Sequence, residues 1–203
     1  MASQTKKGNN IIRQRPRDRR TAIVQSALKL FASKGIAETS IPDIAEAANV
    51  AVGTLYCYFA SKEALANFLI TESSQAMCKY LWDGFPFSAT YRHQFSFFWR
   101  RYLVFAVEHP ATYTYLHHRA KDFNQDKTSK KAMKTLEEIK SWIIDRGIAT
   151  EELRPMPKVA LNAILHGTAN ALIQAHLKGQ LKLDEITITQ TEQCCWQAVT
   201  MAI

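Results

Sequence analysis

Apolar side chains recur at helical spacing along most of the chain, and no stretch alternates convincingly with a period of two. In the first clear segment, residues 17–34, Ile23, Ala27, Leu30 and Phe31 fall at i, i+4, i+7 and i+8. That spacing places the four side chains on one face of a helix. The pattern along the whole chain predicts an all-α fold of about nine helices.

The same spacing continues through the C-terminal three quarters of the chain. It predicts helices over residues 61–83, 88–108, 111–118, 130–146, 157–178 and 187–202, with a polar loop at 122–129. Gly84, Pro110 and Gly179 stand where three of these helices are expected to end.

The stretch TSIPDIAEAANVAVGTLYCYFASKEAL, residues 39–65, predicts a helix-turn-helix unit. Ser40 and Asp43 have the spacing of a capping box at the start of a short helix. Asn49 suits a left-handed turn residue, and Ala51 provides no side-chain cap for the next helix, expected at 52–59. Such a unit presents its second helix to the major groove of DNA.

Together with the helix before it, this stretch resembles the DNA-binding signature of the tetracycline-repressor (TetR) family of transcriptional regulators, and about 45 residues match in order. The family usually has glycine where Asn49 stands and often serine where Ala51 stands. The resemblance implies an N-terminal three-helix domain, a helical body that binds a small ligand and forms a homodimer, and a palindromic operator on double-stranded DNA.

The resemblance also implies roles for single residues. Val52 and Gly53 are expected near base edges, and DNA backbone contacts are expected from Thr39, Ser40, Thr54, Tyr56, Tyr58 and Lys62. Tyr56 and Tyr58 have a second interpretation as ordinary packing aromatics of a small helical bundle. Cys57, on the same helix, fits either a redox-sensitive position or a tolerated small residue.

The formal net charge of +8 is unevenly placed. Residues 1–20 hold seven basic residues and one acid, a balance of +6, which leaves +2 for the other 183 residues. A basic arm on a near-neutral body suits phosphate binding, whereas a solubilising tail is the alternative. Because a helix-turn-helix follows directly, we expect the basic residues from Arg13 to Arg20 to bind DNA. This set includes Arg19 and Arg20. The expected organisation is a flexible basic arm at 1–16, a DNA-binding domain at 17–62 and a ligand-binding and dimerisation domain at 63–203.

Small residues recur on one face of the helix predicted at 157–178, and a similar stripe occurs on the last helix. Small side chains allow close approach between helices. In the TetR family the last two helices pair with those of a second subunit. The resemblance therefore implies a dimer interface that includes Ala163, Gly167, Ala171, Ala175, Cys195, Val199 and Ala202.

Residues 80–123 are rich in aromatic side chains. Most are expected in a packed core, but the helix around residues 95–105 is apolar nearly all round, which is typical of a helix that is buried on several sides or lines a cavity. The resemblance implies a ligand pocket there, for which we select Trp99, Tyr102, Tyr113, His117, Trp142, His166 and Asn170.

Other classes of protein are disfavoured. We find no nucleophile elbow, phosphate-binding glycine loop, paired catalytic carboxylates or metal-ligand spacing, so neither an enzyme nor a metal or cofactor site is expected. No segment is long and apolar enough for a membrane span or a signal peptide, which indicates a cytoplasmic protein. Because structural disulfides are rare in the cytoplasm, none is expected here.

The sequence thus predicts a ligand-responsive repressor released by a small, largely apolar effector, although an activator role stays open. The alternative is a DNA-binding adaptor whose body binds a protein partner and no small ligand. The free volume inside the body would distinguish the two, because a filled interior favours the adaptor.

Overall fold

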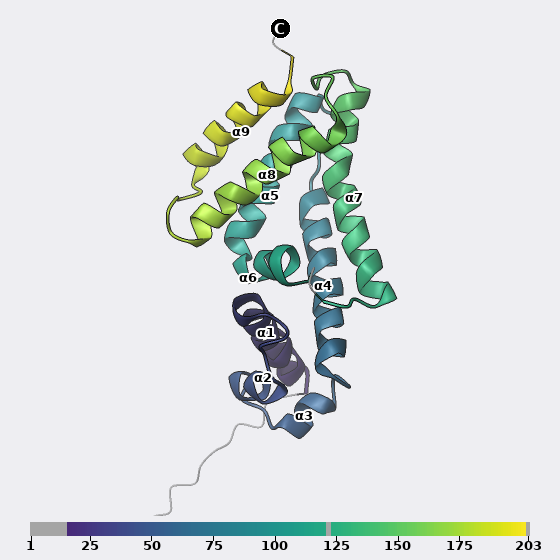
Figure 1. Ribbon diagram of the computed structural model, residues 1–203, viewed down its shortest axis with the longest axis vertical. Coiled ribbons are helices and arrows are strands. Elements are labelled where there is room, and N and C mark those ends of the chain that lie inside the picture. Colours follow the sequence, from purple (N-terminus) through teal and green to yellow (C-terminus); the bar gives the residue numbers. More distant parts are fainter. Residues whose placement is uncertain (1–15, 121–122, 202–203) are drawn as a thin grey trace, which may run out of the picture.

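A computed structural model describes residues 16–120 and 123–201, and in these residues the backbone forms nine α-helices, one π-helical turn and no sheet (Figure 1). The prediction of an all-α fold with about nine helices is confirmed. The elements are α1 (Pro16–Lys34), α2 (Ile41–Ala47), α3 (Val52–Tyr56), α4 (Lys62–Trp82), α5 (Tyr91–Glu108), α6 (Pro110–Thr114), the π-turn η1 (Tyr115–Arg119), α7 (Lys127–Ala149), α8 (Lys158–Leu177) and α9 (Glu185–Val199).

Local chemistry explains the helix-turn-helix. The Ser40 hydroxyl accepts from the Asp43 amide at 3.2 Å, and the Asp43 carboxylate accepts from the Ser40 amide at 3.1 Å, so the predicted capping box starts α2. Asn49 has the left-handed φ of 53° that the turn after α2 needs. As predicted, Ala51 gives α3 no side-chain cap.

The helices α1 to α3 enclose a small core at the lower end of the molecule (Figure 1). Ile23, Phe31 and Leu55 are fully buried in it, and Phe59 is 6% exposed. The predicted inward faces of α1 and α3 are therefore confirmed, except that Leu30 is only half-buried.

The helix α4 belongs to two cores. Near its start, Leu65 and Ile70 are buried in the core of α1 to α3, whereas Met77 and Leu81 are buried in the core of the body. Figure 1 shows α4 running from beside α3 upward into the body. The position of α4 in the body therefore determines where the short helix α3 lies.

Several predicted helix boundaries differ by two or three residues, and local contacts explain two of the differences. The third helix ends at Tyr56 and not at Phe59, because Phe59 turns into the core and Ser61 adopts an extended backbone to cap α4. The loop predicted at 122–129 contains the start of α7, because the Asp126 carboxylate accepts from the Ser129 amide at 2.8 Å and caps that helix.

The body packs α5 between α4, α8 and α9 around a largely aromatic core (Figure 1). Arg92 of α5 makes a bidentate ion pair with Glu192 of α9, whose side chain is almost fully buried. A second ion pair joins Arg100 to Glu185, so two charge pairs join α5 to α9. None of the described helices is long and apolar enough to cross a membrane.

Tyr115, in η1, connects the body to the N-terminal core. Its ring stacks on Phe31 of α1 with centroids 5.9 Å apart, and its hydroxyl donates to the Ala66 carbonyl of α4 at 2.9 Å. Burial raises the pKa of the Tyr115 phenol, which therefore stays a hydrogen-bond donor at neutral pH.

We expect Tyr115→Phe to lower the free energy of unfolding by about 1–2 kcal/mol, because it removes a buried hydrogen bond and keeps the ring. Urea denaturation followed by circular dichroism measures the effect. The control is Tyr56→Phe, since Tyr56 is 51% exposed and should change stability by less than about 0.5 kcal/mol. Equal stabilities of the two variants would show that the Tyr115 hydroxyl contributes nothing.

Candidate nucleic-acid interface and effector cavity

The helix α3 presents a small, weakly polar outer face. Val52 is 39% exposed, Tyr56 is 51% exposed, and a β-carbon added at Gly53 would meet nothing within 4 Å. Thr54 is half-buried beside them. Apart from Tyr56, this face carries only small side chains, so it can approach the floor of a DNA groove closely but offers few hydrogen bonds to base edges.

The two tyrosines of the motif, Tyr56 and Tyr58, differ in exposure. Tyr56 points away from the core, whereas Tyr58 is half-buried and packs against the core of α1 to α3. Tyr56 is therefore more accessible for a contact with the DNA backbone than Tyr58, and the interpretation as a packing aromatic suits Tyr58 better.

Thr39 does not have an accessible hydroxyl. Its side chain is only 1% exposed, and its Oγ1 donates to the Gly35 carbonyl at 2.7 Å. The expectation of a side-chain contact from Thr39 to DNA is therefore wrong, because this hydroxyl closes the turn before α2. Ser40 is exposed, and its hydroxyl oxygen accepts from the Asp43 amide at the start of α2.

Lys62, the first residue of α4, lies beside the loop that precedes α2. Its Nζ donates to the Thr39 carbonyl at 3.0 Å and to the Ala37 carbonyl at 3.2 Å. Two of the three ammonium hydrogens are therefore used inside the protein, and one remains for an outside acceptor. Lys62 thus ties α4 to the start of α2 in addition to any contact with DNA.

The two predicted arginines of α1 lie on the N-terminal half of that helix. The Arg20 guanidinium is 4.4 Å from the centroid of the Phe68 ring and 5.6 Å from that of Phe59, so it joins α1 to α4 by cation–π contact. Arg19 is half-buried. The arm proposed at residues 1–16 lies outside the described residues except for Pro16.

Cys57 is exposed at the end of α3, and its Sγ donates to the Gly53 carbonyl at 3.2 Å. A thiol is a weak donor, so this bond adds little to the short helix. Nothing around Cys57 in the described residues distinguishes a redox role from a tolerated small residue.

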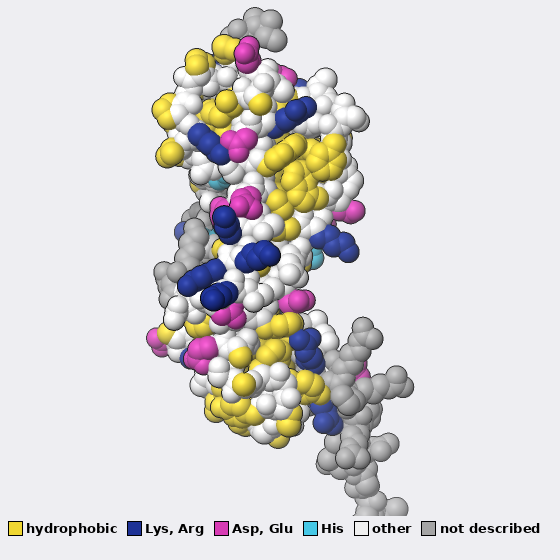
Figure 2. All heavy atoms as spheres, turned by 90° about the vertical axis from the view of Figure 1, so that its right-hand side faces the viewer, with side chains coloured by type: hydrophobic (Ala, Val, Ile, Leu, Met, Phe, Trp, Pro, Cys, Tyr) yellow, Lys and Arg dark blue, Asp and Glu magenta, His cyan; other side chains and the backbone are white. Residues whose placement is uncertain are grey.

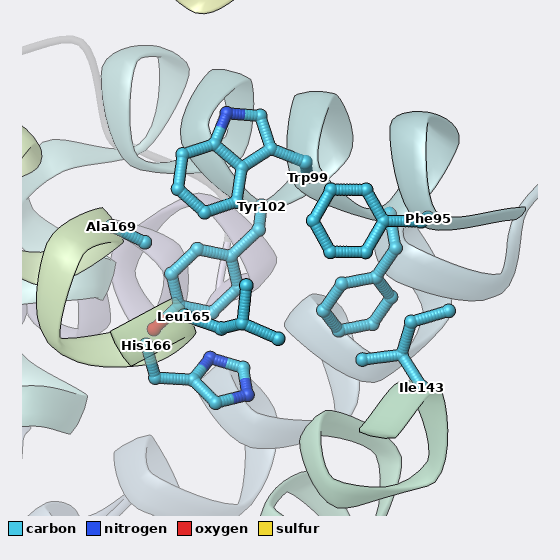
Figure 3. Close-up of a pocket in the computed structure, with 8 residues that line it drawn as sticks. Phe95, Trp99, Tyr102, Ile143, Leu165, His166 and Ala169 are labelled. Carbon is cyan, nitrogen blue, oxygen red and sulfur yellow. The ribbon is translucent and has the colours of Figure 1, made fainter. Parts of the chain in front are cut away.

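The body encloses a small apolar cavity between α5, α7 and α8. Phe95, Phe98, Trp99, Tyr102, Ile143, Leu165, His166 and Ala169 line it, and Figure 3 shows their side chains converging from these three helices. Its free volume is only about 20 Å³, close to the size of one water molecule. Three of the seven residues selected from the sequence, Trp99, Tyr102 and His166, are among the lining residues.

Three more of the selected residues form a polar cluster with Tyr102. The Asn170 Oδ1 accepts from the Tyr113 hydroxyl at 2.5 Å and from the Tyr102 hydroxyl at 3.2 Å. The Tyr102 oxygen is also 3.3 Å from His117 Nε2, which must then donate, since the Tyr102 proton is already used. Burial raises the pKa of both phenols, so they stay protonated donors.

Trp142, the seventh selected residue, does not reach the cavity. Its ring packs against Trp82, Phe85 and Phe87, with centroids 5.1, 5.4 and 6.2 Å away. The assignment of Trp142 to the pocket is therefore wrong, because its side of α7 faces the end of α4 and the loop after it.

The cavity carries no charged lining residue. Burial lowers the pKa of His166 to about 4, with a smaller contribution from the nearby Lys140 ammonium, so the imidazole is neutral at physiological pH. Its Nε2 lies 3.1 Å from the Lys140 carbonyl. The lining thus suits an uncharged, largely apolar group.

The stripes proposed for the dimer interface divide into an outer and an inner set. Ala163, Gly167 and Ala171 are exposed on α8, Ala175 is half-buried, and a β-carbon at Gly167 would meet open space. On α9, Cys195 and Val199 are at most 5% exposed and belong to the body's own core, so their assignment to the interface is wrong. Ala202 lies outside the described residues.

Exposed apolar side chains that the sequence analysis missed continue the outer face of α8 and α9. Val159 is 80% exposed on α8, and Ile186 is 69% exposed on α9. Val159 stands four residues before Ala163 and could have been found by extending that stripe.

Comparisons with known proteins agree with this architecture. A family model described as "Bacterial regulatory proteins, tetR family" matches residues 23–68, and a model described as "Tetracyclin repressor-like, C-terminal domain" matches residues 69–201. The two matches together cover both the helix-turn-helix and the helical body.

Individual relatives are similar over only part of the chain. The chain is 41% identical over 71 residues to the HTH-type transcriptional regulator EthR of Mycolicibacterium smegmatis, a match that covers 34% of this chain and 33% of that protein. It is 40% identical over 52 residues to the HTH-type transcriptional repressor KstR2 of Rhodococcus jostii, which covers 26% of each. Both matches therefore span a third or less of the relative's own length.

The fold extends over nearly the whole chain. A TetR family transcription regulator from Marinobacter aquaeolei superposes with a TM-score of 0.75 at 22% identity, covering 94% of this chain and all of that one. Since the C-terminal family model alone matches well over half of the chain, this protein belongs to the TetR family of helix-turn-helix transcriptional regulators, which are DNA-binding proteins and not enzymes.

Proposed function

We propose that this regulator binds a palindromic operator as a homodimer and represses transcription until an effector releases it. The observation that carries the proposal is the outer face of α3, which exposes Val52, Gly53 and Tyr56 on a helix-turn-helix whose first helix begins with a capping box and whose turn has the left-handed Asn49. A single helix of five residues reads few base pairs, so two copies on a palindrome are needed for specificity.

The proposed DNA contacts keep the motif residues except Thr39, whose hydroxyl is buried. Val52 and Gly53 meet base edges, and Ser40, Thr54, Tyr56, Tyr58 and Lys62 meet the DNA backbone together with Arg19 and Arg20. Because α3 offers few hydrogen bonds to bases, backbone contacts and DNA shape supply much of the recognition.

The proposed dimer uses the outer face of α8 and α9. The exposed small residues Ala163, Gly167 and Ala171 allow a partner helix to approach closely, and Val159 and Ile186 add apolar contact. A two-fold axis through this face would hold the two copies of α3 about 34–36 Å apart, one turn of DNA.

The proposed effector is small, uncharged and largely apolar, as the neutral lining of the cavity suggests. An effector of that kind would alter the packing of α5 and α8 and, through α4, the separation of the two recognition helices. The effector can shift the equilibrium between the DNA-binding state and the released state only by as much as its binding free energy differs between these two states. We also infer a cytoplasmic location, where such a regulator meets its operator.

A second candidate function is favoured by the small size of the cavity. Free volume of about 20 Å³ cannot hold an effector without movement of the lining side chains, so the body as described is nearly filled. This favours an adaptor that binds DNA and a protein partner and no small ligand. A thermal-shift screen of neutral apolar compounds distinguishes the two functions, because only a ligand-binding regulator should be stabilised by such a compound. Trp99→Ala should then change the affinity for a compound that binds in the cavity.

We expect Lys62→Ala and Tyr58→Phe to weaken binding to all DNA sequences alike, because both residues are assigned to phosphates. Loss of one ionic phosphate contact at Lys62 should also reduce the slope of log K against the logarithm of the salt concentration by about one. Fluorescence anisotropy on operator and random duplexes at several salt concentrations measures both effects.

The control for this comparison is Lys29→Ala, an exposed lysine on α1. A loss confined to one operator sequence would contradict the phosphate assignment. A loss of affinity at Lys62 with an unchanged salt slope would mean that its two carbonyl bonds, and not a phosphate, explain its role.

Deleting residues 1–16 should flatten the salt dependence of DNA affinity, because the deletion removes Lys6, Lys7, Arg13 and Arg15. Each lost phosphate contact lowers the slope by about 0.9. The same anisotropy titration measures it, and an unchanged slope would refute a role of the arm in DNA binding.

We expect Ala171→Glu to dissociate the dimer, raising its Kd at least about tenfold, because it places a carboxylate in an apolar interface. Analytical ultracentrifugation at micromolar concentration should give twice the chain mass of 23.1 kDa for the natural protein and a shift towards 23.1 kDa for the variant. Ala76→Glu, on the exposed side of α4, is the matched control. A natural protein that sediments as a monomer would exclude the proposed dimer.

A further inference from the structure

Four lysines crowd the start of α7. Lys127, Lys130, Lys131 and Lys134 are all exposed and stand at i, i+3, i+4 and i+7, which places them on one face of the helix. We call them the lysine row. Figure 2 shows dark blue side chains grouped at mid-height on this side of the molecule, below a yellow hydrophobic patch.

The lysine row is unfavourable for the isolated helix. The N-terminal end of a helix repels positive charge, and like charges three or four residues apart repel each other. The first turn of α7 contains no acid, so at this end of the helix only the N-cap carboxylate of Asp126 offsets the positive charge. Natural proteins tolerate such local conflicts mainly where a function requires them.

Within the described residues the row is hardly neutralised by the protein itself. Its one ion pair joins Lys134 to Glu138 at 3.5 Å. The nearest preceding carboxylate, that of Asp126, accepts from the Ser129 amide at 2.8 Å and the Ser129 hydroxyl at 2.9 Å as the helix cap. An external anion would relieve both the repulsion and the unfavourable helix dipole.

A groove beside the row offers space for such an anion. It lies between α4 and α7, has a volume of about 420 Å³, and is lined by Thr71, Gln75, Cys78, Thr128, Lys131, Ala132 and Thr135. The lining contains hydroxyl, amide and ammonium groups but no carboxylate. We call it the α4–α7 groove. It shares no lining residue with the apolar cavity of the body.

We propose that the α4–α7 groove binds a phosphate-bearing small molecule, whose anionic groups the lysine row neutralises. Lys131 contacts the phosphate from the groove wall, and Lys127 and Lys134 flank it on the same helix face. Thr128 and Gln75 donate hydrogen bonds from the two sides. A bound molecule therefore bridges α7 and α4, the helix that leads to α3.

Inorganic pyrophosphate is the probe, and the thiol of Cys78 in the groove wall is the reporter. Because burial raises the pKa of Cys78, alkylation is run at about pH 8.5, where a thiolate fraction reacts. At about ten times its Kd, pyrophosphate should slow alkylation of Cys78 about tenfold. The exposed Cys57 and Cys194 serve as internal controls in the same peptide-resolved mass-spectrometry experiment.

Lys130→Gln combined with Lys131→Gln supplies a second, opposite readout. The double variant should melt at a higher temperature than the natural protein without ligand, because two repelling charges are gone. It should also lose the protection of Cys78 and the rise in melting temperature that pyrophosphate gives the natural protein. Lys178→Gln, at the end of α8 where positive charge is favourable, is the control and should keep both effects.

Three results would overturn the proposal. The first is pyrophosphate that neither protects Cys78 nor raises the melting temperature. The second is protection that survives in the double variant. The third is a double variant that binds pyrophosphate as the natural protein does but whose affinity for DNA depends less on salt concentration. That result would mean that the lysine row binds DNA.

Discussion

The burial of α4 in two cores is the constraint on which the rest of the structure depends. Leu65 and Ile70 are held by the DNA-binding unit, and Met77 and Leu81 are held by the body. A helix of 21 residues is stiff over that length, so its tilt is set by packing at both ends. Any shift of the body end therefore changes the orientation of the end that adjoins α3, and no separate hinge is required.

The stability of the recognition helix comes from its neighbours and not from its own sequence. With five residues and no side-chain cap, α3 would not persist alone in water. It is held by the buried Leu55, while Arg20 stacks on Phe59 just after the helix and Lys62 ties α4 to the turn before α2. Arg20 and Lys62 thus stabilise the fold through contacts within the protein, whether or not they also contact DNA.

The sequence predicted the local chemistry better than the direction in which each helix faces. The capping box of Ser40, the left-handed Asn49 and the missing cap at Ala51 depend on neighbouring residues only, and all three are confirmed. The assignments of Thr39, Trp142, Cys195 and Val199 failed because helical spacing shows that residues share a face without showing what that face meets. Free volume in the body could not be predicted at all, because it depends on how rings from three helices interlock.

The polar cluster around Tyr102 connects the nearly filled interior of the body to the π-turn η1. An effector that enters must displace lining rings, and Tyr102 is the ring that is also bonded to Asn170 and His117. Tyr113 shares the same acceptor and stands two residues before Tyr115, which is buried against Phe31 in the DNA-binding unit. Rearranging these bonds would therefore act on the π-turn η1 directly. An apolar molecule that left the cluster unpaired would lose several hydrogen bonds, so an effector with one neutral hydrogen-bonding group is favoured over a pure hydrocarbon.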